Sequence, residues 1–221
     1  PQRSLDFGAQ WIELAPSTID TYTPRGIGYV PAGDGTFVLG GGGSGDGDVV
    51  LSADAGDSWW HPDALPMPCG ESVRGIHGLG DTIVIARPGG AEAAELCVTE
   101  DGGHVWTEVD LGDVYLESRM ILADDTFMIW SAGERWSSTD GVQWSSLPTE
   151  PAITIGAVAR DDEGTFVAVR GGWQVWYESQ EFYRSADGIA WEVLPPGAFV
   201  GSHPVNQIAF GRVDATESAC R

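Results

Sequence analysis

The stretch Ser52–Trp59, S-A-D-A-G-D-S-W, decides the fold because the chain repeats its pattern three more times. The second copy, T-E-D-G-G-H-V-W, spans Thr99–Trp106, and the third, S-T-D-G-V-Q-W, spans Ser138–Trp144. The fourth copy is S-A-D-G-I-A-W, at Ser185–Trp191. The starts of successive copies are separated by 47, 39 and 47 residues, a spacing typical of repeat architectures.

The residue types of this motif predict a tight turn. An Asp carboxylate accepts backbone N–H bonds within a turn, Gly adopts positive φ, and the Ser or Thr hydroxyl adds a further partner. The Trp begins the next strand and fills the gap between neighbouring units. We therefore assign structural rather than catalytic roles to the repeated residues, which are Asp54, Asp101, Asp140, Asp187, Trp59, Trp106, Trp144 and Trp191.

The residues upstream of each motif predict strands. A turn followed by Thr and branched or aromatic residues occurs in G-D-G-T-F-V-L (33–39), G-D-T-I-V-I (80–85), D-D-T-F-M-I (124–129) and D-E-G-T-F-V-A-V (162–169). Each unit then reads as strand, tight turn, strand, variable loop, strand, motif turn and strand. This order is that of a four-stranded propeller blade.

We predict one all-β domain over residues 1–221, a β-propeller with five blades. Four blades are expected at residues 25–65, 72–111, 117–148 and 153–195. A closing blade combines residues 205–213 with 10–15, because closure removes exposed sheet edges. The alternative is that the chain is a fragment of a longer propeller.

The motif resembles the Asp-box, or BNR, repeat of sialidases, sortilin-like receptors, photosystem assembly factors and carbohydrate-active enzymes. The first two copies match S/T-x-D-x-G-x-x-W, and the last two are one residue shorter. The resemblance implies a propeller. Sialidases also carry an F/Y-R-I-P motif, and no R-I-P occurs here, which argues against sialidase activity.

Charge and cysteine content narrow the partners and the location. The net charge is −22, with 33 acidic residues against 11 basic ones, all arginine, so nucleic acid and anionic membranes are poor partners. No apolar run reaches the roughly 20 residues of a membrane span. We expect the protein to be a monomer. Cys69 and Cys97 are expected at the same face of the second blade, which predicts a disulfide and a secreted or periplasmic protein. Cys220 is expected to stay free or to pair outside this chain.

The predicted ligand site is the mouth of the central channel, opposite the motif turns. Arg25, Arg74 and Arg119 each begin an inner strand there, and convergent arginines suit an anionic or polar group. The alternative is that they pair with neighbouring acids such as Glu71 and Glu117.

An aromatic loop, residues 171–183, is expected to overhang the same mouth. Its Trp173, Trp176, Tyr177 and Tyr183 offer flat faces for a sugar ring or an apolar ligand. The alternative is a hairpin whose aromatic side chains pack on the neighbouring blade.

The mouth also contains residues that would suit catalysis. His77 and His203 are candidate metal ligands or proton carriers, although a strand histidine is also a common hydrogen-bonded core residue. Glu71, Glu117 and Glu178 are candidate catalytic acids, since a glycosidase needs two nearby carboxyl groups. No cofactor is assigned beyond a metal ion at the two histidines.

Three functions follow in order of preference. The first is a secreted propeller that binds a glycan, a peptide or a protein at the channel mouth. The second is a carbohydrate-active hydrolase or lyase, and the third is a metal-dependent enzyme that uses the histidines.

Overall fold

In the computed structural model the chain is all-β, and the residues described contain no helix. The structure describes residues 2–3, 10, 12–13, 24–29, 37–41, 49–54, 56–63, 65–66, 69, 73, 75–87, 95–112, 114, 116, 118–171, 181–195, 205 and 208–210. Within this part of the chain, nothing has the helical length and apolarity needed to cross a membrane.

The strands form antiparallel sheets of sequential hairpins. Blade 1 comprises β3 (Pro24–Tyr29), β4 (Phe37–Gly41) and β5 (Val49–Ser52), and blade 2 comprises β6 (Gly75–Leu79), β7 (Thr82–Arg87), β8 (Glu95–Thr99) and β9 (Thr107–Asp110). Blade 3 comprises β10 (Ile121–Ala123), β11 (Thr126–Ser131), β12 (Glu134–Ser138) and β13 (Ser145–Pro148). Blade 4 comprises β14 (Ile155–Arg160), β15 (Phe166–Arg170), β16 (Phe182–Ser185) and β17 (Glu192–Val193).

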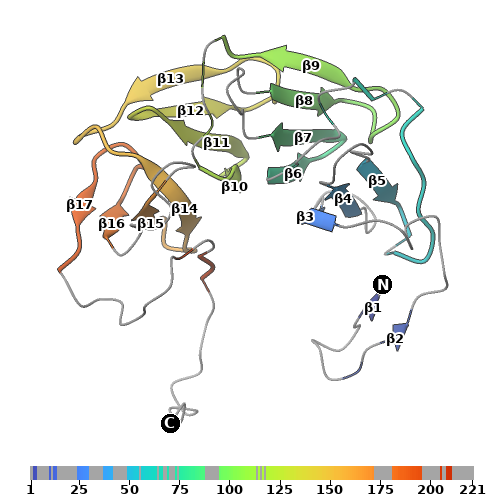
Figure 1. The fold of residues 1–221 in the computed structure, drawn as a ribbon, viewed down its shortest axis with the longest axis horizontal. Helices are drawn as coiled ribbons and strands as arrows, with labels where there is room; N and C mark the ends of the chain where they lie inside the picture. The colour runs from blue at the N-terminus through green and yellow to red at the C-terminus, as the bar shows by residue number, and fades with distance from the viewer. Residues whose placement is uncertain are drawn as a thin grey trace.

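The blades follow one another along an arc, with the first strand of each blade on the inner side (Figure 1). Among these inner strands, β6 contacts both β3 and β10, and β10 contacts β14. A radial series of four-stranded antiparallel sheets around inner first strands is the architecture of a β-propeller. The fold predicted from the repeats is therefore confirmed.

The hairpin between β10 and β11 shows why the sequence turns there. Ala123 pairs with Thr126, and the two residues between them, Asp124 and Asp125, have φ of 48° and 54°. Two successive residues at positive φ form the type I′ turn, whose twist matches that of the flanking strands. Aspartate tolerates this backbone region better than most residues.

The core lies between neighbouring blades rather than within one blade. Alternate residues of β7 face opposite sides: Ile83 packs with blade 1, whereas Val84 packs with blade 3. In β11, Phe127 likewise packs toward blade 2 and Trp130 toward blade 4. Because successive strand side chains point to opposite faces, a strand buried on both faces reads as an unbroken apolar run, as in T-F-M-I-W.

The described residues include only part of the predicted closing blade. Ile12–Glu13 forms β2, which pairs with β1 (Gln2–Arg3). Val205 and residues 208–210 lie in no strand, and the rest of 205–213 lies outside the described residues. In blade 1, a single bridge between Leu51 and Trp60 takes the place of the fourth strand. The number of blades stays a prediction.

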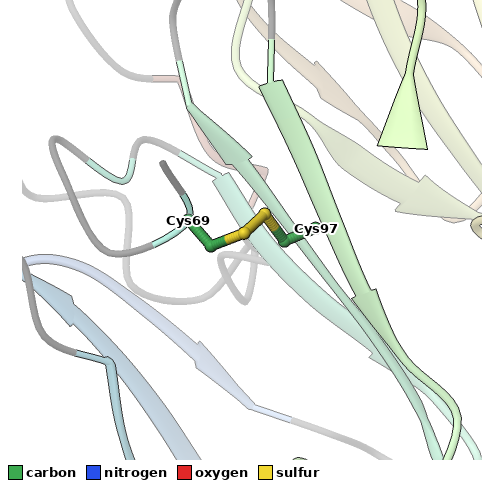
Figure 2. The surroundings of a disulfide bond; sticks show 2 residues. All are labelled: Cys69 and Cys97. Atoms are coloured by element: carbon green, nitrogen blue, oxygen red, sulfur yellow. A yellow bond between two sulfur atoms is a disulfide. The ribbon is translucent and has the colours of Figure 1, made fainter. Parts of the chain in front are cut away.

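The predicted disulfide between Cys69 and Cys97 is confirmed (Figure 2). It ties the segment before β6 to β8, with 5.7 Å between the two Cα atoms, and both cysteines are buried. The bond thus attaches the segment that connects blades 1 and 2 to blade 2 itself.

Removing this disulfide is expected to lower the free energy of unfolding by about 2–4 kcal/mol, since the bond restricts the unfolded chain. The change is Cys69→Ser together with Cys97→Ser, measured by urea denaturation without reductant. Cys220→Ser is the matched control, because Cys220 lies outside the bond. Equal midpoints for the double variant and the native protein would contradict a stabilising role.

Candidate functional site

The four motif copies form the same hydrogen-bonded turn. In each turn the Ser or Thr hydroxyl donates to the Asp Oδ1 at 2.7–3.0 Å and accepts the N–H of a turn glycine at 2.8–3.0 Å. The Trp Nε1 donates to the carbonyl of that same glycine at 2.8–3.2 Å. These glycines are Gly56, Gly103, Gly141 and Gly188. We call the four copies the repeat turns.

Hydrogen bonds within the repeat turns keep the aspartates ionised. The hydroxyl and the N–H of Ser58 lower the pKa of Asp54 to about 2, and the Ser52 hydroxyl contributes. Backbone N–H donors, led by those of Val105, Gln143 and Ile189, lower the pKa values of the other three aspartates. A carboxylate held in this way is a hydrogen-bond acceptor for the turn and is poorly suited to donate a proton.

The lowered pKa values predict that the protein loses stability below about pH 4. The stabilisation by Asp54 is complete above the ordinary pKa of 3.8 and disappears as the pH falls toward about 2. Asp54→Asn should therefore flatten the decline of the melting temperature between pH 5 and pH 2. Glu163→Gln is the control, because Glu163 is an exposed acid outside the repeat turns. Equal declines in both variants would count against this role.

The repeat turns also join adjacent blades. Gly103 of blade 2 lies so close to Leu51 of blade 1 that a Cβ there would overlap the leucine side chain. A Cβ on Gly141 of blade 3 would lie 2.5 Å from Val84 of blade 2. The carbonyl of Gly188 in blade 4 accepts the Nε1–H of Trp130 in blade 3 at 2.8 Å. The turns of blades 2, 3 and 4 thus each serve as a packing surface for the preceding blade.

The predicted arginines stand in the sequence at or just before the starts of three inner strands. Arg25 is the second residue of β3, Arg74 directly precedes β6, and Arg119 lies two residues before β10. Of the three, only Arg119 has a described side chain, and it is exposed. Several other candidates lie outside the described residues, namely Glu71, Glu117, Trp173, Trp176, Tyr177, Glu178 and His203.

Tyr183 does not belong to the aromatic loop as expected. It lies in β16 with 3% of its surface exposed, inside the core cluster between blades 3 and 4. Its hydroxyl donates to Glu181 Oε2 at 2.7 Å, and burial together with this carboxylate raises the pKa of Tyr183 to about 12. The strand begins before Tyr183, so its side chain packs inward and is not available to a ligand.

His77 has a structural partner. It lies in β6, and its Nε2–H donates to the carbonyl of Met120, just before β10, at 2.9 Å. Burial lowers the pKa of His77, so the ring is neutral at neutral pH. This bond joins blades 2 and 3 at their inner strands. Within the described residues, no group of three or more His, Cys, Asp or Glu side chains could hold a metal ion.

The sequence did not predict a groove of about 520 Å³ beside β9, the outer strand of blade 2. Its lining includes Val98, Glu108 and Asp110 of blade 2, together with Val142 from the repeat turn of blade 3. Val105 and Val142 are exposed apolar residues in two otherwise polar motif turns. In the sequence, only these two valines could have suggested the groove.

Comparisons with known proteins agree with the propeller fold. No protein-family model matches the chain, and no curated protein matches it. Among solved structures, YCF48 bound to D1 peptide is 17% identical with a TM-score of 0.59, covering 90% of this chain and 59% of that one. An ancestral GH74 enzyme is 16% identical with a TM-score of 0.62, covering 90% and 28%.

A third similar structure comes from a nidogen/laminin complex, at 10% identity and a TM-score of 0.59, with 85% of this chain and 68% of that one covered. The chain therefore spans less than two thirds of the YCF48 chain and under a third of the GH74 chain. At these identities the similarity establishes the fold only, and any activity must be argued from the residues of this chain.

Proposed function

We propose that this protein is a binding propeller that holds a glycan, a peptide or a protein segment at the channel mouth. The proposal is supported by the contacts of β6 with β3 and β10, because Arg25, Arg74 and Arg119 stand in the sequence at or just before the starts of these three strands. Guanidinium groups gathered there would fix an anionic or strongly polar group of the ligand.

The ligand's apolar part is assigned to the aromatic loop. Trp173, Trp176 and Tyr177 follow the last residue of β15 in the sequence. The repeat turn of blade 4 begins at Ser185, which pairs with Phe166 at the other end of β15. Tyr183 is left out because it is buried in β16. Stacking on aromatic faces accommodates both sugar rings and peptide side chains. The solved YCF48 structure, described as bound to D1 peptide, supports a propeller of this kind as a peptide-binding scaffold.

We also assign the repeat turns to the Asp-box type and the protein to a secreted or periplasmic location. The shared hydroxyl–carboxylate–glycine hydrogen bonds support the first assignment. The Cys69–Cys97 disulfide supports the second, because disulfides persist in oxidising compartments.

The test is a binding screen on glycan and peptide arrays with the native protein and the Trp173→Ala/Trp176→Ala double variant. Losing a stacking residue should weaken binding of any array ligand about tenfold or more, without lowering the melting temperature. Arg74→Ala should weaken the same ligand most at low salt, because screening acts on exposed charge. Unchanged affinity in both variants would show that the ligand does not bind at the channel mouth.

A hydrolase is the second candidate, because an ancestral GH74 enzyme shares the fold over 90% of this chain. Its acids would be Glu71, Glu117 and Glu178. Mass spectrometry of array glycans incubated with the protein would reveal cleavage products. Glu117→Gln should then abolish cleavage while binding persists. If every glycan that binds stays intact, the hydrolase candidate is rejected and binding remains the proposed function.

A further inference from the structure

The groove beside β9 lies between two blades. Its floor is apolar, because Val98 and Val109 belong to the core cluster between blades 2 and 3. Val105 and Val142, from the repeat turns of blades 2 and 3, also line the groove and are 59% and 40% exposed. Exposed apolar side chains that flank a groove of this size are typical of binding surfaces.

The polar lining of the groove is acidic. Its described residues contribute the carboxylates of Glu100, Asp101, Glu108 and Asp110 and no basic side chain. On β17, the corresponding outer strand of blade 4, Glu192 is instead paired with Arg184 at 2.8 Å. The groove therefore combines an apolar floor with carboxylates that no arginine in its lining neutralises, and a partner with opposite charge would complement it.

The strand that borders the groove has one edge without a partner strand among the described residues. Among the described strands, β9 pairs with β8 alone and closes the order β6-β7-β8-β9. The outward N–H and C=O groups of such an edge can pair with an extended segment of another chain, while side-chain contacts beside the strand select the sequence.

We propose that this groove binds an extended, positively charged segment of a partner protein, in which basic and apolar residues alternate. The apolar side chains contact Val105 and Val142, and the basic ones face Glu100 and Glu108. Alternation fits because successive side chains of an extended chain point to opposite sides. The site lies at the outer edge of blade 2 and is independent of the channel mouth.

The probe is a nine-residue peptide of alternating lysine and valine, acetylated and amidated, titrated calorimetrically into the 221-residue protein. We expect saturable binding that weakens several-fold between about 50 mM and 300 mM salt. Glu100→Gln/Glu108→Gln should weaken binding about three- to tenfold, and Val142→Ser about threefold. These side chains are exposed, so the variants should melt with the native protein.

The matched control is Leu147→Ser/Glu163→Gln, which removes an exposed apolar group and an exposed acid away from the groove. It should bind the peptide with native affinity. A peptide with the same composition but with its lysines in one block should bind at least fivefold more weakly. Absent binding, equal weakening in the control, or equal affinity for the block peptide would each overturn the proposal, the last two by revealing unspecific attraction to an acidic surface.

Discussion

We expect Trp130→Ala to lower the free energy of unfolding by about 3–5 kcal/mol, as for other large buried aromatic residues. Trp130 is 1% exposed, lies edge-on to Phe166 and Trp191 in blade 4, and donates to the Gly188 carbonyl. The substitution thus opens a cavity between two blades and removes a bond that joins them. Chemical denaturation monitored by circular dichroism measures the effect.

Two variants separate packing from position. Trp130→Phe should cost less, because most of the ring volume remains and Gly188 still accepts the Nε1–H of Trp191 at 3.1 Å. Trp59→Ala should also cost less, since Trp59 is half-buried and belongs to none of the core clusters. If Trp130→Ala were no more harmful than Trp59→Ala, the core would not lie between the blades.

Gly103→Ala is expected to lower the free energy of unfolding by about 2–5 kcal/mol. Gly103 has φ of 106°, which an L-residue adopts at a cost of roughly 1–2 kcal/mol. The added methyl also overlaps the fully buried Leu51 of blade 1, and overpacking of this kind costs roughly 1–3 kcal/mol. Urea denaturation of the variant beside the native protein gives the difference.

The neighbouring Gly102 provides the control. It also has positive φ, 74°, but a Cβ there would meet nothing within 4 Å. Gly102→Ala should therefore show only the backbone cost of about 1–2 kcal/mol. Equal losses at the two glycines would mean that the repeat turn does not pack against the preceding blade.

The sequence predicts the fold because the deciding interactions are local. Within a repeat turn, the hydrogen bonds that join Ser52 to Asp54 and to Gly56 span at most four residues. The eight-residue motif therefore contains all the partners of these bonds. Four copies then predict a radial series of sheets. Trp130 was missed because it ends an apolar run, T-F-M-I-W, that has no motif, and its partner Gly188 is 58 residues away.

The candidate sites were less predictable because they depend on register and on neighbouring blades. Tyr183 was expected on a loop with Trp176, but the pairing of Ala168 with Tyr183 extends β16 across it and turns its ring into the core. The groove beside β9 requires Val142 of blade 3 to approach Val98 of blade 2, and no local pattern encodes that approach. The Cys69–Cys97 pair could be predicted because the blade order brings both cysteines to one face.

We expect the repeat turns to act as scaffold and the ligand to bind on the opposite face of the propeller. Amide hydrogen exchange tests this directly, on the free protein and on the protein with a ligand from the arrays. The amides of Gly56, Gly103, Gly141 and Gly188, which donate to hydroxyls, should exchange slowly in both states. New protection should appear in peptides that contain Arg74 and residues 172–180. Fast exchange at the four glycines, or new protection confined to the repeat turns, would contradict the account.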